Sequence, residues 1–147
     1  MIKKLSTLLT DLDSKKGPDF EGLGIIVYSD LTNLPVSSIV LDDSTLLLPK
    51  EKYDDILNTL FSISTLESKF HDGFHLLSSD FVLTGISKYF STPIISDLKI
   101  QNNYGSRYRT ALYGSFVENV LYTAVLSKNY GPVIFEKGVE INPDAIY

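Results

Sequence analysis

Two arginines, Arg107 and Arg109, are the residues of this sequence whose type and spacing most clearly indicate chemistry. They are the only arginines of the chain; the other eleven of its 13 lysine and arginine residues are lysines. Gly105 and Ser106 precede them where a loop and a helix N-cap are expected, so both arginines fall in a first helical turn. Unpaired N–H groups and the helix dipole favour anions there, and guanidinium groups bind phosphate well. The stretch therefore predicts a phosphate site.

Helix geometry limits how the two arginines share a ligand. Residues two apart on a regular helix point about 200° apart, so both reach one anion only if it lies over the helix end. The alternative is that Arg107 and Arg109 pair with surface carboxylates, which 18 acidic residues make easy. Such exposed pairs contribute little to stability.

A second stretch, KFHDGFHLL, places Asp72 and Gly73 directly before a strand that begins at Phe74. A carboxylate there is placed to hold a divalent cation, and the glycine lets a ligand approach the backbone. The alternative is an ordinary Asp-Gly turn. His71 and His75 are four residues apart, but a metal pair at that spacing needs a helix and the pattern indicates a strand. Asp72 is therefore the metal candidate.

Helices and strands that position these stretches follow from hydrophobic spacing. Apolar residues at helical intervals predict an N-terminal helix over residues 1–16, which docks on the rest, and a helix from Tyr53 with acids in its first turn. β-branched apolar runs predict strands at 23–29, 36–41 and 120–127. A hairpin over 74–87 and a strand pair over 132–141, turning at Lys137 and Gly138, complete the pattern. The order predicts an α/β fold with a mixed central sheet flanked by helices on both faces.

Composition excludes several classes of protein. A chain of 147 residues has the length of one domain, which we expect to span 1–147, and it has no cysteine for disulfides or thiolate metal sites. The net charge of −5 without a basic face excludes binding of a nucleic-acid polymer. No signal peptide is evident, and no apolar run approaches the roughly 20 residues that span a bilayer. We expect a soluble, cytoplasmic protein without a membrane partner.

Together the two stretches resemble the diadenylate cyclase domain, a family that condenses two ATP molecules into cyclic di-AMP. Its motifs are Asp-Gly-Ala at the head of a strand and, further along, Gly-Thr-Arg-His-Arg-Ala-Ala at the start of a helix. The corresponding residues here are Asp72, Gly73 and Phe74, and then Gly105, Ser106, Arg107, Tyr108, Arg109, Thr110 and Ala111. The order and setting of both motifs agree with the family across most of the chain.

The resemblance implies roles for these residues. Asp72 would bind a divalent metal, Mg²⁺ or Mn²⁺, and help to activate a 3'-hydroxyl. Arg107, Arg109 and the Ser106 hydroxyl would hold the triphosphate. The nucleotide-binding set implied by the motifs is Asp72, Gly73, Phe74, Gly105, Ser106, Arg107, Tyr108, Arg109 and Thr110. The family's enzymes work as face-to-face dimers, which implies a homodimer or higher oligomer here.

Departures from the family favour binding over turnover. Where family members carry Ser-Glu-Glu-Thr-Gly, this chain has the stretch SKNYG over 127–131, which replaces acids by a cation and an amide. Phe74 occupies the motif position where the family has a small alanine, and Tyr108 the position where it has a histidine. The prediction is a sensor of ATP or a cyclic dinucleotide with reduced or absent turnover. The alternatives are an active cyclase in which Asp97 or Glu118 supplies the missing acid, and an interaction module that only keeps the fold.

Overall fold

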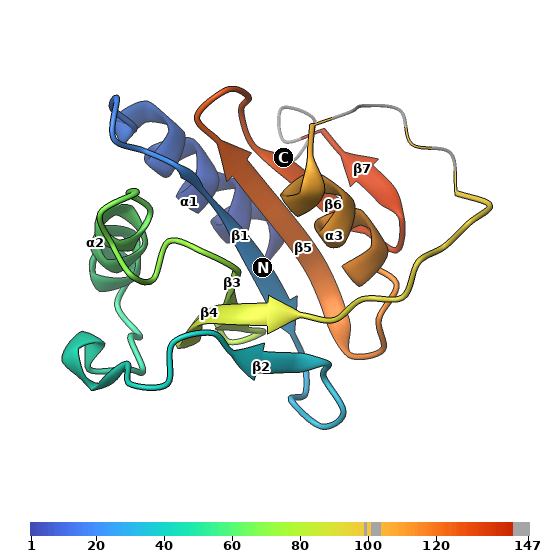
Figure 1. Ribbon diagram of the computed structural model, residues 1–147, viewed down its shortest axis with the longest axis horizontal. Helices are drawn as coiled ribbons and strands as arrows, with labels where there is room; N and C mark the ends of the chain where they lie inside the picture. The colour runs from blue at the N-terminus through green and yellow to red at the C-terminus, as the bar shows by residue number, and fades with distance from the viewer. Residues whose placement is uncertain (99, 101–103, 143–147) are drawn as a thin grey trace.

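A computed structural model describes residues 1–98, 100 and 104–142 (Figure 1). The helices and strands follow in the order α1 (Ile2–Lys15), β1 (Gly22–Tyr28), β2 (Val36–Ser38), η1 (Ser44–Leu46), α2 (Tyr53–Ile63), β3 (Phe74–Ser78), β4 (Leu83–Phe90), α3 (Ser106–Gly114), β5 (Val120–Ser127), β6 (Val133–Glu136) and β7 (Val139–Ile141). The described strands form one seven-stranded sheet in the order β2-β4-β3-β1-β5-β6-β7. Its β1–β3 pair is parallel and its other pairs are antiparallel.

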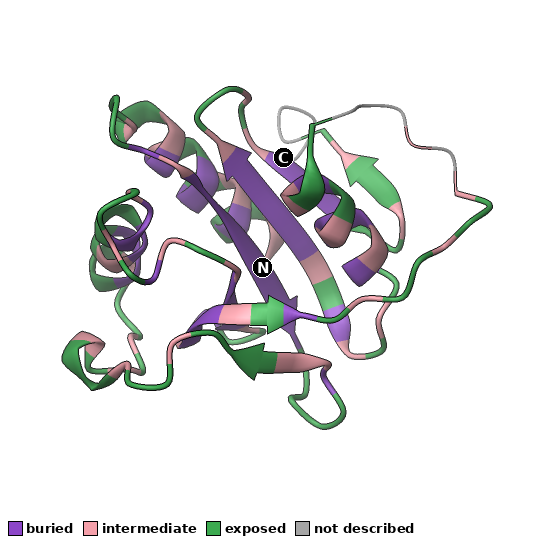
Figure 2. Cartoon of the chain, viewed as in Figure 1, coloured by how far each residue is buried: buried purple, intermediate pink, exposed green. Residues whose placement is uncertain are grey.

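Helices cover both faces of this sheet (Figure 1). Helices α1 and α2 pack on one face, where the leucines of α1 share a buried cluster with α2 and β1. Helix α3 packs on the other face through Tyr108, Ala111 and Leu112. Every residue of β1 is buried because the strand is central and covered on both sides (Figure 2). The predicted mixed α/β architecture is confirmed.

Most predicted elements lie within one or two residues of the observed ones. Two strand ends differ by three residues: β4 continues to Phe90 where the predicted hairpin ends at 87, and β2 ends at Ser38 where a strand was predicted over 36–41. Strand β2 lies at the sheet edge and has only β4 as a partner. The residue of β4 opposite Ile39 is Ser87, and its positive φ of 52° bends β4 away from the chain that follows β2. The Ile39 N–H still bonds the Ser87 carbonyl at 3.0 Å, but pairing stops there because a bent strand offers no further register.

His75 is a fully buried strand histidine, as its sequence setting predicts. Its Nδ1 accepts the Ser87 N–H at 3.1 Å, so its proton is on Nε2, which has no hydrogen-bond partner among the described residues. Burial, aided by the positive charge of Arg107, lowers the pKa of His75 to about 3. The folded protein therefore keeps this ring neutral at pH values where an unfolded chain protonates it.

Acid is expected to destabilise the fold through His75. The histidine of the unfolded chain has a pKa of about 6.5. Below that pH the unfolded state therefore binds a proton at this residue, and the folded state does not. The free energy of unfolding should fall by about 2 kcal/mol between pH 6.5 and pH 5, where few carboxylates titrate. Urea unfolding at both pH values measures this loss. His75→Asn keeps an acceptor for the Ser87 N–H without titrating and should remove most of it; an unchanged loss would contradict the assignment.

Candidate functional site

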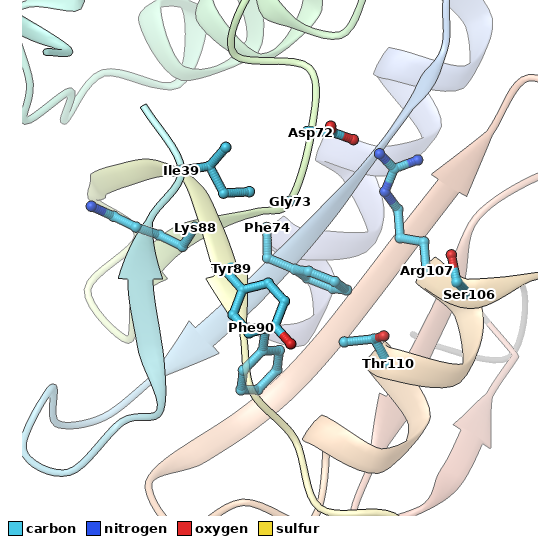
Figure 3. A pocket seen from close by; sticks show the side chains of 10 residues that line it. All are labelled: Ile39, Asp72, Gly73, Phe74, Lys88, Tyr89, Phe90, Ser106, Arg107 and Thr110. Atoms are coloured by element: carbon cyan, nitrogen blue, oxygen red, sulfur yellow. The ribbon is translucent and has the colours of Figure 1, made fainter. Parts of the chain in front are cut away.

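A cavity of about 480 Å³ lies between helix α3 and the strands β3 and β4 (Figure 3). Asp72 and Gly73 line one side at the start of β3, and Ser106, Arg107 and Thr110 line the other side from the first turns of α3. Volumes of about 300–1,000 Å³ are typical of small-molecule sites. The two sequence stretches that predicted chemistry thus meet at one cavity.

Arg107 reaches from α3 across to the amino-terminal ends of β1 and β3. Its Nη2 donates to the His71 carbonyl at 3.3 Å, and its Nη1 lies so near Gly22 that a Cβ there would be only 3.0 Å away. Burial lowers the pKa of the guanidinium, and the negative charges of Asp72 and Glu21 oppose that shift. The group still stays protonated near neutral pH, because a guanidinium loses its proton only in strongly alkaline solution.

In the part of the chain that the structure describes, no carboxylate lies within ion-pair distance of this guanidinium. Among the described residues the ion pairs within 4.0 Å are Lys16–Asp13 and Lys128–Glu21. Arg107 is therefore a half-buried cation whose charge faces the cavity without an ion-pair partner. A half-buried charge in this state is a strong site for an incoming anion, because protein surroundings screen it less than water does.

Asp72 is exposed on the facing side of the cavity, and its carboxylate points toward Arg107 (Figure 3). It is the acidic residue of the cavity lining. The described part of the chain contains no group of three or more His, Cys, Asp or Glu side chains placed to hold a metal ion. Asp72 can therefore offer one carboxylate to a cation but not a complete coordination shell.

Three residues of the predicted set lie outside the cavity lining. Gly105 is the N-cap of α3, with a φ of 97° and open space where a Cβ would lie. Arg109 is exposed, on a different side of α3 from Arg107, as the 200° separation requires. Tyr108 is 2% exposed, and its hydroxyl donates to the Glu140 carboxylate at 2.8 Å. The structure brings Arg107, Ser106 and Thr110 to Asp72, and directs Arg109 and Tyr108 elsewhere.

A cluster of three tyrosines, Tyr104, Tyr108 and Tyr130, adjoins this helix end. Tyr104 and Tyr130 stack with centroids 4.5 Å apart, and Tyr104 meets Tyr108 edge-on at 5.1 Å. The stack joins the segment before α3 to the segment after β5. No local signal in the sequence marks this stack, because Tyr104 and Tyr130 are 26 positions apart.

Two phenylalanines, Phe74 and Phe90, form the apolar floor of the cavity. Their rings meet at 5.6 Å in an edge-to-face contact. The Phe74 ring lies on Gly24, where a Cβ would be 2.6 Å from it, and the Phe90 ring lies on Gly114, where a Cβ would be 2.2 Å away. The rings and their glycines thus connect β1 to α3. The predicted site included Phe74 but missed Phe90, because its glycine contact is not local in the sequence.

The rim of the cavity carries Ile39, Lys88 and Tyr89, which sequence reasoning also missed. Ile39 is 44% exposed and Tyr89 is 60% exposed. These aliphatic and aromatic side chains remain open to a ligand rather than packing into the core. No motif marks them, because they reach the site only through the pairing of β2 with β4.

The stretch 127–131 has no acid at the position where the family carries Ser-Glu-Glu. Lys128 instead pairs with Glu21 at 3.4 Å, and Ser127 accepts the Lys16 ammonium through its carbonyl at 2.9 Å. Asp97 and Glu118 are exposed and do not line the cavity. Neither of the suggested replacement acids therefore stands beside Asp72.

Solved structures that share this fold include a protein from Bacillus cereus and one from Staphylococcus aureus. A hypothetical membrane spanning protein from Bacillus cereus aligns with a TM-score of 0.66 and 17% identity, over 94% of this chain and 61% of that one. DacA from Staphylococcus aureus, crystallised as a double mutant, aligns with a TM-score of 0.65 and 15% identity, over 97% and 87%. The chain thus spans about three fifths of the Bacillus chain. Such identities show the fold, so the chain has a DacA-like fold.

Neither a protein-family model nor a curated protein matches the sequence. Among the described residues, no helix combines the length and the apolar character that crossing a bilayer requires.

Proposed function

We propose that this chain is a nucleotide-binding domain that holds the phosphates of ATP or a cyclic dinucleotide, and that it acts as a sensor with little or no turnover. The observation that carries this proposal is the half-buried Arg107, which has no ion-pair partner among the described residues and faces a cavity of about 480 Å³. A DacA-like fold supports it, since DacA is a diadenylate cyclase.

Phosphates fit the α3 side of the cavity. Arg107 offers several donors in a planar fork, and the hydroxyl groups of Ser106 and Thr110 add two more on the same helix. The amino-terminal end of α3 adds its dipole and unpaired N–H groups. The base and ribose would extend toward the rim, where the exposed Tyr89 and Ile39 provide an apolar surface.

The carboxylates that line the cavity are too few to hold a metal ion on their own. They fit a divalent cation that binds together with the nucleotide. One carboxylate, Asp72, faces the phosphate side, and Mg²⁺ in nucleotide sites is commonly held by one or two carboxylates together with phosphate oxygens. Such a cation would neutralise part of the phosphate charge and bridge the phosphates to Asp72. The chain itself supplies Arg107 and Asp72 as opposite charges across the cavity, which orient a ligand that carries both signs.

Loss of turnover follows from the region around 127–131. The acids that the resemblance implies are replaced there, and Lys128 occupies the region with a positive charge paired to Glu21. Ligand charge supplies much of the binding energy of a divalent cation, so this exchange weakens any catalytic metal site. The second candidate, an active cyclase, is favoured by one observation: Asp72 is exposed and directed into the cavity, as an activating carboxylate must be.

Incubation with ATP separates the two candidates. The purified chain, at several concentrations so that any dimer can form, is mixed with ATP and Mg²⁺ or Mn²⁺, and the products are resolved by liquid chromatography. The proposal expects ATP to bind in calorimetry and to be recovered unchanged. Formation of cyclic di-AMP that Asp72→Asn abolishes would overturn the sensor assignment in favour of the cyclase. Absence of binding by both ATP and cyclic di-AMP below about millimolar would overturn both.

A further inference from the structure

The cavity has a polar end and an apolar end. Its charged and hydroxyl groups, from Asp72, Ser106, Arg107 and Thr110, gather between α3 and the start of β3. Toward β2 and β4 the lining changes to Ile39, Phe74, Lys88, Tyr89 and Phe90 (Figure 3). A nucleotide whose phosphates meet Arg107 and that fills the cavity places its base at the second end.

Side chains at the apolar end offer few groups that could distinguish one base from another. Ile39, Phe74 and Phe90 have no polar atom. Lys88 donates its ammonium to the Ser38 hydroxyl at 2.8 Å, which turns it away from α3 (Figure 3). The Tyr89 hydroxyl is both a donor and an acceptor, so it meets an amino group and a carbonyl equally well.

The main chain at this end is engaged in the sheet. Lys88, Tyr89 and Phe90 of β4 pair with residues 36–38 of β2, and Lys88 also pairs with Phe74 of β3. Backbone groups used in these strand ladders are not free to bind the edge of a base; Phe90, which lies beyond the last β3–β4 pair at Lys88, has its main-chain groups outside the ladder on that side. The described lining therefore holds the phosphates by specific polar groups and the base mainly by apolar contact.

We propose that this site selects nucleotides by their phosphates and is tolerant of the base, so that ATP and GTP bind with similar affinity. The inference rests on the proposed nucleotide-binding function and narrows its ligand class to nucleoside polyphosphates. Strong selection of one base requires buried polar partners that the wrong base leaves unpaired. Stacking, which every base can provide, supplies affinity without such selection.

Calorimetry with a matched set of nucleotides tests the inference. ATP and GTP are expected to bind within about threefold of each other, and CTP and UTP within about tenfold because pyrimidines stack less. Removing phosphates from ATP to ADP to AMP should weaken binding by about tenfold or more in total, since each loses contacts with charged donors. ATP binding more than about thirtyfold tighter than GTP would overturn base tolerance and leave the nucleotide-binding function intact. If none of these nucleotides binds, both proposals fail.

Two variants of Tyr89 distinguish stacking of its ring on the base from recognition of the base by its hydroxyl. Tyr89→Ala removes an exposed ring and should weaken ATP and GTP by a similar factor, about 5- to 100-fold. Tyr89→Phe keeps the ring and removes only the hydroxyl, so the ratio of the ATP and GTP affinities should stay unchanged. A Tyr89→Phe variant that loses ATP binding while it keeps GTP binding would show that the hydroxyl reads the base, and would overturn the proposal.

Discussion

Replacing Arg107 by alanine is expected to weaken ATP binding by about 10- to 150-fold, which corresponds to the loss of about 1.5–3 kcal/mol from charged hydrogen bonds. Arg107 lines the cavity and has no ion-pair partner among the described residues, so its charge remains available to a phosphate. Isothermal titration calorimetry with ATP and Mg²⁺ measures the change. Raised salt should weaken the wild-type affinity more than that of the variant, because the variant has lost one phosphate contact.

Arg109→Ala is the matched control for this experiment. It removes the same functional group two residues away, from an exposed position outside the cavity lining. We expect it to change ATP affinity by less than about threefold, as is usual for a screened surface charge. Loss of binding in Arg109→Ala, with Arg107→Ala unaffected, would contradict the assignment of the phosphate contact to Arg107.

The stability of the ligand-free protein provides a second readout. A half-buried charge without an ion-pair partner costs solvation energy, and removing it relieves that cost. The melting temperature of Arg107→Ala without nucleotide should therefore stay the same or rise, while the increase that ATP gives the wild type disappears. A lower melting temperature without nucleotide would instead indicate that Arg107 serves the fold through its bond to the His71 carbonyl.

The sequence predicted the elements whose periodicity is local. Helix α2 follows from its apolar spacing, and the buried β1 from a continuous apolar run, because each pattern reports one element's own surroundings. Asp72 and Arg107 were found because motifs set them at the starts of a strand and a helix. Their approach to one cavity depends on where β3 and α3 lie in the fold, which the family resemblance implied and periodicity alone did not.

Other parts of the site depend on contacts that no local pattern encodes. Helical geometry separates Arg107 from Arg109, but the side of α3 that faces the sheet is set by the packing of Tyr108. Tyr89 reaches the cavity rim only because β4 pairs between β2 and β3. The shortened β2 reflects a positive φ at Ser87, a serine for which nothing in the sequence forecasts that conformation. Non-local pairing and backbone strain thus limited the sequence prediction.

The contact between Phe74 and Gly24 gives the second large expected effect, which is a loss of folding stability. Phe74→Ala should cost about 3–5 kcal/mol of unfolding free energy, because it empties the space between β1 and Phe90. Gly24→Ala should cost about 1–3 kcal/mol, since the new methyl group would lie 2.6 Å from the Phe74 ring and force it to move. Urea unfolding of both variants measures these losses. Gly17→Ala is the matched control, because nothing lies within 4 Å of the added methyl group.

Combining the two substitutions should recover part of the loss. The atoms nearest to a Cβ at Gly24 all belong to the Phe74 ring, so without that ring the methyl group meets the emptied space instead of a clash. Gly24 is not among the glycines with positive φ, so alanine fits its backbone. The double variant should therefore be more stable than the sum of the single losses predicts, by about 1–3 kcal/mol. If the losses of the two single variants add to within about 0.5 kcal/mol of the double variant, the position of the Phe74 ring does not depend on the missing side chain of Gly24. Phe90 alone would then fix the floor of the cavity.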